Sequence, residues 1–217
     1  MPSERRILGV LLAGGLSRRM GGGDKCLRPL AGRPILAHVI DRARPQAAGL
    51  VLNANGDPAR FAGFGLPVAA DVVDGFAGPL AGVLTGLEWA RSRTPAFTHV
   101  VTFATDTPFL PFDLVDRLIA AAERDGTPLA AAASDGQAHP VFGLWPVSLA
   151  ADLRRALVEE GMRKVDLWTA RYGIALADFA TDLIDPFFNT NRPEDLAAAE
   201  RMARALEHDD TRTRSGV

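Results

Sequence analysis

The residues best suited to chemistry gather in one glycine-rich, basic stretch near the amino terminus. Glycine lacks a Cβ, so its backbone N–H groups can approach a phosphate closely, while arginine and lysine neutralise phosphate charge. Neither G-x-x-x-x-G-K-[S/T] nor G-x-G-x-x-G fits this stretch, so the two commonest phosphate-loop templates do not apply. We still expect a polyphosphate site, formed by Gly14, Gly15, Gly21, Gly22, Gly23, Arg18, Arg19 and Lys25.

Lys25 stands out because lysine is rare in this chain. Of the 24 basic residues, only Lys25 and Lys164 are lysines. A chain that otherwise uses arginine is expected to keep a lysine where a compact ammonium is needed. The alternative is that Lys25 arose by drift and that the glycines form an ordinary surface turn.

Three further polar residues follow apolar segments that read as strands. Asn53, Asp71 and Asp106 all fall at predicted carboxyl ends, which meet at one edge of a parallel sheet, beside the glycine-rich loop. Asp106 is the best metal-ligand candidate, because Mg²⁺ takes few protein carboxylates and fills its other positions with phosphate oxygens and water. Taken singly, each residue could equally be part of a turn.

The elements that must position these residues alternate between strands and helices. Short apolar runs predict strands, and apolar faces at helical spacing predict helices between them, which favours a parallel sheet with right-handed crossovers. In the first half we expect strands at Ile7–Leu12, Gly49–Asn53, Leu66–Ala70 and His99–Ala104, and helices at Pro34–Ala43, Gly78–Arg91 and Phe112–Glu123.

The second half is less regular but continues the same pattern. We expect one domain over residues 1–207 and a disordered polar tail over 208–217. The predicted elements are strands at Pro128–Ala133, Val141–Leu144 and Ile174–Phe179, and helices at Leu149–Glu159 and Pro193–Leu206.

Composition excludes several classes of function. A net charge of −2 and a pI near 6.1 argue against broad binding to nucleic acid or anionic membranes. The single cysteine, Cys26, cannot form an internal disulfide, which fits a reducing cytoplasm. Lys25 beside it could lower the thiol pKa, but no paired base is recognisable, so we expect Cys26 to be a packing residue. We also expect no export signal, because the apolar run after Arg5 and Arg6 is short and interrupted by glycine.

The glycine-rich stretch resembles the signature loop of the molybdenum cofactor guanylyltransferases. The shared pattern is L-A-G-G-x-S-x-R-M-G-G-x-D-K, here Leu12 to Lys25. Further segments are similar to family motifs, so the likeness runs from about Leu8 to Glu200: Asn53–Asn55, Asp71, Gly78–Gly82, Asp106–Pro108, His139–Pro140, Gly161–Val165 and Asn189–Glu194.

This resemblance implies a fold, a reaction and a set of site residues. The implied fold is a three-layer α/β sandwich with a mostly parallel central sheet, of the Rossmann-like nucleotidyltransferase type. It would have a nucleotide-binding half to about residue 110 and an acceptor-binding half from about residue 111 to 207. Arg19, Lys25 and Asp106 would be catalytic, with Asp106 on Mg²⁺. GTP would contact Leu12, Ala13, Gly14, Gly15, Lys25, Asn53, Asp71 and Asp106. The acceptor, molybdenum-molybdopterin, would contact His139, Arg163, Lys164, Asn189 and Asn191.

The implied reaction is nucleotidyl transfer from GTP to the terminal phosphate of molybdopterin, with release of pyrophosphate. A phosphate monoester is already largely a dianion at neutral pH, so no general base is required. Cofactor-assembly proteins, molybdoenzymes or their chaperones are the expected protein partners. Two other readings stay open: a related cytidylyl- or sugar-phosphate nucleotidyltransferase, and a non-catalytic GTP-binding regulator.

Overall fold

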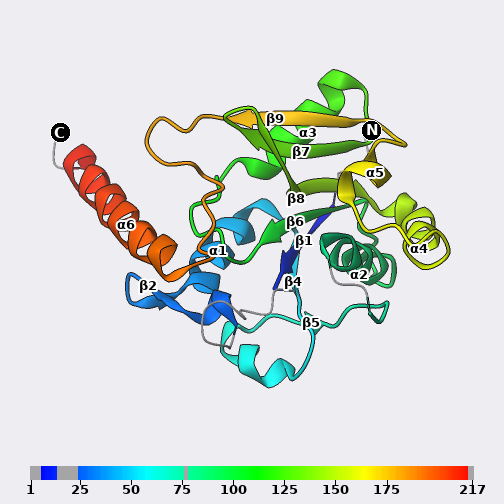
Figure 1. Cartoon of the computed structure of the whole chain (residues 1–217), viewed down its shortest axis with the longest axis horizontal. Helices are drawn as coiled ribbons and strands as arrows, with labels where there is room; N and C mark the ends of the chain where they lie inside the picture. Colours follow the sequence, from blue (N-terminus) through cyan, green and yellow to red (C-terminus); the bar gives the residue numbers. More distant parts are fainter. Residues whose placement is uncertain (1–5, 14–23, 76–77, 215–217) are drawn as a thin grey trace.

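The computed structural model describes residues 6–13, 24–75 and 78–214, with side chains up to residue 206. Its centre is a seven-stranded sheet in the order β5-β4-β1-β6-β8-β7-β9 (Figure 1). Of these strands, β8 alone runs antiparallel to its neighbours. The strands are β1 (Ile7–Leu12), β4 (Gly49–Asn53), β5 (Val68–Ala69), β6 (His99–Ala104), β7 (Leu129–Ser134), β8 (Gln137–Pro146) and β9 (Ile174–Phe179).

Helices cover both faces of this sheet, so the predicted three-layer α/β fold is confirmed. α1 and α3 lie on one face, and α2, α4 and α5 lie on the other (Figure 1). The helices are α1 (Ile35–Ala43), α2 (Pro79–Arg91), α3 (Leu114–Asp125), α4 (Ala150–Val158), α5 (Val165–Thr169) and α6 (Pro193–Arg214). Smaller elements are the β2 (Pro29–Leu30) and β3 (Arg33–Pro34) pair and the 3₁₀ turns η2 (Lys25–Leu27), η3 (Arg44–Gln46), η4 (Pro58–Phe64) and η5 (Val147–Leu149).

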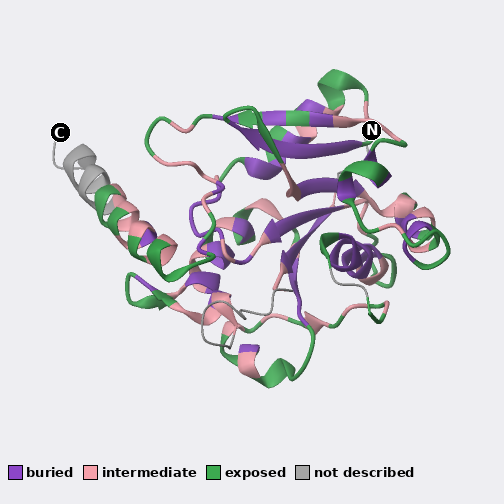
Figure 2. Ribbon diagram, in the orientation of Figure 1, coloured by how far each residue is buried: buried purple, intermediate pink, exposed green. Residues whose placement is uncertain are grey.

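The buried strand β1 explains why the sheet is sandwiched. Alternate side chains of a strand point to opposite faces, and in β1 both sets are apolar. Leu8 and Val10 join the core beneath α2, while Ile7 and Leu11 join the core beneath α1. The strands β1, β4, β6 and β7 are buried for most of their length, whereas many loops and outer helix faces are exposed (Figure 2).

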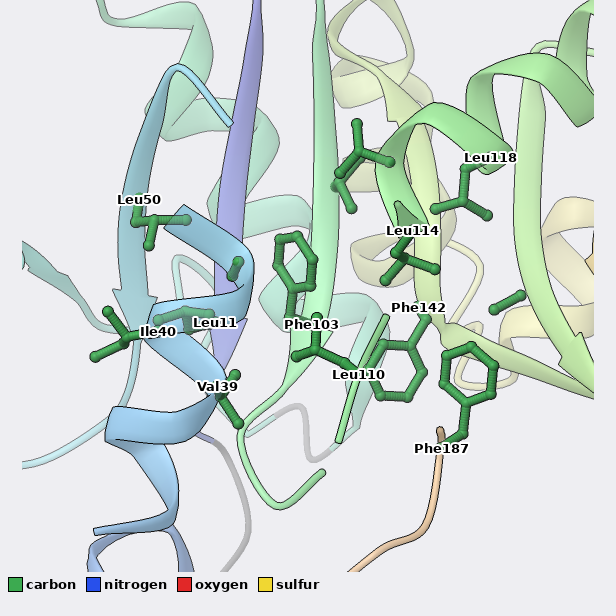
Figure 3. Packing of buried hydrophobic residues seen from close by; sticks show 14 of the residues in the cluster. Leu11, Val39, Ile40, Leu50, Phe103, Leu110, Leu114, Leu118, Phe142 and Phe187 are labelled. Atoms are coloured by element: carbon green, nitrogen blue, oxygen red, sulfur yellow. The ribbon is translucent and has the colours of Figure 1, made fainter. Parts of the chain in front are cut away.

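The core on the α1 and α3 face continues to the segment that follows β9. Aromatic and aliphatic side chains from both halves of the chain pack in one cluster (Figure 3). Phe187 belongs to this cluster and contacts Phe142, with ring centroids 4.8 Å apart. The segment between β9 and α6 is thereby fixed against the body of the protein.

The register of the central strands aligns their carboxyl ends. Leu12, the last residue of β1, pairs with Asn53 of β4 on one side and with Ala104 of β6 on the other. Residues that directly follow these three positions therefore emerge from one edge of the sheet, as predicted.

The structure departs from the sequence expectations in three elements. β5 has two residues rather than five, and β8 has ten rather than four, because β8 pairs with both β6 and β7. α6 continues to Arg214, beyond the predicted helix end at Leu206. Its polar composition does not prevent elongation of a helix that is already nucleated.

Candidate functional site

On one side of the carboxyl edge, two asparagine amides hold the Asp71 carboxylate. Asn53, at the end of β4, donates from Nδ2 to Asp71 Oδ1 at 2.9 Å. Asn55 donates from Nδ2 to Asp71 Oδ2 at 2.8 Å and accepts from the Asp71 backbone N–H at 2.8 Å. Each carboxylate oxygen keeps a second lone pair, so Asp71 is oriented and can still accept hydrogen bonds from a ligand.

The first turns of α2 are shaped to fit Asn53. A Cβ on Gly82 would lie 2.5 Å from Asn53 Oδ1 and 2.5 Å from a Leu12 methyl, so this position requires glycine. Gly78, just before the helix, has φ +149°, which side-chain-bearing residues rarely adopt. The glycines of the Gly78–Gly82 motif therefore allow α2 to approach the ends of β1 and β4.

Asp106 lies two residues beyond β6, and the segment before α6 packs onto it. The Thr190 backbone N–H and hydroxyl both donate to the Asp106 carbonyl oxygen, each at 2.9 Å. Burial raises the pKa of the Asp106 carboxyl, and the Lys25 ammonium offsets part of this rise. A carboxylate that has lost much of its water is a good partner for a cation.

Lys25 lies between the two halves of the chain. Its Nζ donates to Asn191 Oδ1 at 2.8 Å, and its charge acts on Asp106. Lys25 and the distant Asp106 therefore lie near one another, and their shared role in a site stays a prediction.

This edge is covered by a known family model. The model described as "MobA-like NTP transferase domain" matches residues 9–172, which include most of β1, the group of Asn53, Asn55 and Asp71 (the Asp71 clamp), Asp106 and β8. The chain belongs to the MobA-like NTP transferase family. It is therefore a nucleotidyltransferase, as the sequence predicted.

Two relatives of this MobA-like transferase have the same name, and each aligns with this chain over nearly its whole length. A "Molybdenum cofactor guanylyltransferase" from Bradyrhizobium sp. is 59% identical over 93% of this chain and 95% of its own length. The protein of that name from Mesorhizobium japonicum is 53% identical over 94% of this chain and 99% of its own length.

Solved structures agree on the fold of this MobA-like transferase. The Archaeoglobus fulgidus molybdopterin-guanine dinucleotide biosynthesis protein A has a TM-score of 0.70, with 23% identity over 91% of this chain and 99% of that one. A CMP:2-keto-3-deoxy-manno-octonic acid synthetase complexed with CTP also reaches 0.70, with 13% identity over 94% of this chain and 99% of that one. The fold is thus shared by enzymes with different nucleotides and does not identify the base.

Predicted acceptor residues of this MobA-like transferase occur on both sides of the sheet. Asn189 accepts a hydrogen bond of 2.7 Å from the Thr107 hydroxyl, beside Asp106. His139 Nε2 lies 2.7 Å from the Ser134 hydroxyl, and burial lowers the His139 pKa. Arg163 and Lys164 instead lie between α4 and α5, where Arg163 caps carbonyls of Leu157 and Met162.

Part of the predicted site lies outside the described residues. Gly14, Gly15 and Arg19 fall within residues 14–23, so their proposed phosphate contacts remain predictions. Their described neighbours fit the site, since Ala13 N–H donates to the Asn53 carbonyl at 2.9 Å. Leu12 packs against the α2 core.

Cys26 has the packing role expected of it. Its side chain is 3% exposed in the α1 core. Burial, reinforced by Asp24, raises the pKa of the Cys26 thiol to about 12. A thiol in this state is not a nucleophile.

Three residues that support the site were not found from sequence. The Arg60 guanidinium bridges Asp24 Oδ2 at 2.6 Å and the Asn55 carbonyl at 2.6 Å, which ties the residue before Lys25 to the Asp71 clamp. Ser134 and Asp185 form a hydrogen-bonded group with His139. No spacing signal marks these residues, because each acts across segments distant in sequence.

The described residues hold no group of three or more His, Cys, Asp or Glu side chains suited to a metal. A single carboxylate such as Asp106 nevertheless fits Mg²⁺ when the remaining ligands are substrate oxygens and water. Among the described helices, none is long and apolar enough to cross a membrane.

Proposed function

We propose that this protein transfers GMP from GTP to the terminal phosphate of molybdenum-loaded molybdopterin, forming a guanine dinucleotide. A molybdopterin phosphate oxygen bonds to the α-phosphorus, the bond from that phosphorus to the bridging oxygen breaks, and pyrophosphate leaves with the electron pair. The observation that carries this proposal is the meeting of Lys25 and Asp106 at the edge where three strands end. The names of relatives at 53% and 59% identity support the choice of substrates.

Catalysis in this proposal is positioning and charge neutralisation. Lys25 places its ammonium against the triphosphate, where negative charge shifts toward the departing pyrophosphate. Asp106 would hold Mg²⁺, which supplies positive charge to the phosphate oxygens when bound. The attacking phosphate is largely a dianion at neutral pH, so no side chain has to remove its proton.

Guanine selection is assigned to Asp71. Guanine presents an N1–H and an exocyclic amine on one edge, and a carboxylate can accept from both. Asn53 and Asn55 fix the orientation of the Asp71 carboxylate. A base without these two donors would leave the carboxylate oxygens without hydrogen bonds from the ligand. Discrimination against CTP follows from this arrangement.

The remaining assignments follow from this reaction. Arg19 and the loop glycines are proposed to contact phosphates. The acceptor side comprises His139, Arg163, Lys164, Asn189 and Asn191. We place the reaction in the cytoplasm, with cofactor-assembly proteins and molybdoenzymes or their chaperones as partners that supply or receive the cofactor.

The test is pyrophosphate release from GTP by the purified protein with molybdenum-loaded molybdopterin and Mg²⁺. We expect release that depends on both substrates and is lost with EDTA. A clear preference for CTP would refute the guanine assignment and leave a nucleotidyltransferase. GTP binding without pyrophosphate release under any of these conditions would instead indicate a regulator.

A further inference from the structure

The Ser134 hydroxyl lies within hydrogen-bond distance of both the His139 ring and the Asp185 carboxylate. Its Oγ is 2.7 Å from His139 Nε2 and 3.1 Å from Asp185 Oδ1. Ser134 is 3% exposed, so water does not replace these partners. A hydroxyl has one proton, and it can therefore donate to only one of the two neighbours.

Charge decides which neighbour receives the proton. An ionised carboxylate can only accept, so the Ser134 hydroxyl must donate to Asp185. Asp185 Oδ1 is held in place for this by the Phe187 N–H, which donates to it at 3.0 Å. The Ser134 oxygen is then left as an acceptor, and His139 Nε2 must carry the hydrogen.

This assignment leaves His139 Nδ1 as a hydrogen-bond acceptor. Burial lowers the pKa of His139, so the ring is neutral at pH 7 and has one N–H only. Among the described residues, none donates to Nδ1. Phe187 packs against the ring with centroids 4.7 Å apart, which fixes the ring plane as well.

The position of His139 points toward the reacting edge. The pairing of β8 with β7 shifts register beside it, since Ala131 pairs with Gly143 but Ala132 pairs with His139. Such irregularities re-aim side chains and are frequent next to active sites. From Phe187 the chain runs in two residues to Asn189, which bonds Thr107 next to Asp106.

We propose that Ser134 and Asp185 are positioning residues that hold His139 as its Nε2–H tautomer, so that Nδ1 accepts a hydrogen bond from an N–H group of the acceptor substrate. The identity of that substrate rests on the proposed function, whereas the tautomer does not. A pterin carries ring N–H and amine donors. A His139 Nδ1 that can only accept would bind these donors and would not bind a carbonyl oxygen, which is also an acceptor.

The first experiment measures the tautomer directly by ¹⁵N NMR of the histidine rings at pH 7.5. The chain has four histidines, and a His139→Asn variant assigns the His139 signals. We expect a protonated Nε2 and an unprotonated Nδ1 in the wild type. An Nδ1–H tautomer, or a rapidly exchanging mixture, would overturn the proposal whatever reaction the enzyme performs.

Variants separate the hydrogen-bond chain from general structural damage. Asp185→Asn keeps an oxygen that accepts from Phe187 N–H and from Ser134, so the wild-type tautomer should persist. Ser134→Ala and Asp185→Ala break the chain, and both tautomers should then appear. Thr181→Ala is the matched control, because it removes a 2.8 Å bond to Asp135 between the same two segments without touching His139. A change of tautomer in the control would also contradict the proposal.

Kinetics then test what Nδ1 recognises. An asparagine amide oxygen can occupy the Nδ1 position, whereas a glutamine reaches the Nε2 position. We expect His139→Gln to raise KM for the acceptor about tenfold, equivalent to one good hydrogen bond, with little change in KM for GTP. His139→Asn should raise KM for the acceptor by a smaller factor. Equal acceptor KM in all three proteins would overturn the recognition role, while absence of transfer by the wild type would reject the proposed function and leave the NMR result standing.

Discussion

The two sides of the catalytic edge are built in different ways. On the nucleotide side, the bonds that hold Asp71 join residues 16 and 18 positions apart, and each partner lies at the end of a strand or within two residues of it. On the acceptor side, the bonds that attach the segment between β9 and α6 span longer separations: 51 residues for Ser134 to Asp185, 82 for Thr107 to Asn189 and 84 for Thr190 to Asp106. The nucleotide side is thus formed by residues near the ends of neighbouring strands. The acceptor side depends on the segment between β9 and α6, which packs against β6 and β7.

Lys25 connects the two constructions. It comes early in the chain, yet its hydrogen-bond partner Asn191 lies 166 residues further along. Changes at Lys25 should therefore affect the whole reaction, while changes on either side should affect one substrate more than the other. The following predictions test this division.

The largest effect is expected at the junction itself. Lys25→Ala and Asp106→Ala should each lower turnover by roughly a hundredfold or more, because each removes preorganised charge from the reacting phosphates. Lys25→Arg should restore little, since a planar guanidinium does not replace a compact ammonium. The measurement is kcat for pyrophosphate release, with circular dichroism to check the fold. Arg33→Ala, which removes an exposed pair with Asp41, is the control. Near-normal turnover in both alanine variants would disprove the assigned roles.

A smaller effect on turnover is expected from the loss of the Lys25–Asn191 hydrogen bond. Asn191→Ala removes the acceptor for Lys25 Nζ, so the ammonium becomes free to move, and kcat should fall by about tenfold. Neighbouring Arg192→Ala, which disturbs only an exposed pair with Glu194, should be close to wild type. If Asn191→Ala changed KM for the acceptor alone and left kcat intact, the Lys25–Asn191 hydrogen bond would not be needed to position the ammonium for catalysis.

The same division explains what sequence could predict. The ends of β1, β4 and β6 matched the predicted residues, because buried strands have unmistakable apolar runs and their carboxyl ends must meet. The pairing of Asn53 with Asp71 follows from that rule. The bridge made by Arg60 does not, because nothing in its local sequence requires a guanidinium there.

On the acceptor side, sequence identified residues but not their support. His139, Asn189 and Asn191 were found through resemblance, while Ser134 ended an alanine-rich strand and Asp185 lay in a segment without periodicity. The long β8 was also underestimated, since its first residues are exposed and polar and lack the apolar signal of a strand. Tertiary pairing with β7, rather than local preference, makes this stretch a strand.

The nucleotide side offers a third, milder change. Asn55→Ala removes one of the two amides that orient Asp71, so KM for GTP should rise about three- to tenfold, the effect of one or two hydrogen bonds. KM for the acceptor should stay unchanged, and the preference for GTP over CTP should narrow. Asp57→Ala is the matched control in the same turn, where the side chain caps η4 and does not touch Asp71. An equal rise in both KM values would show that the two sides are not separable.

The smallest effect concerns stability and should run opposite to activity. Burial raises the pKa of Asp106, so ionising this carboxyl disfavours the folded state, and the stabilisation present below the unfolded pKa is lost as pH rises through the folded pKa. Asp106→Asn keeps the shape without the charge. In EDTA and without nucleotide at pH 7.5, we expect it to melt higher than the wild type by roughly 2–4 °C. The difference should shrink as pH falls through the Asp106 pKa, because the wild-type carboxyl then takes up a proton. A lower melting temperature for Asp106→Asn at pH 7.5 would mean that attraction to Lys25 outweighs burial, and that Asp106 does not need a further cation to balance it.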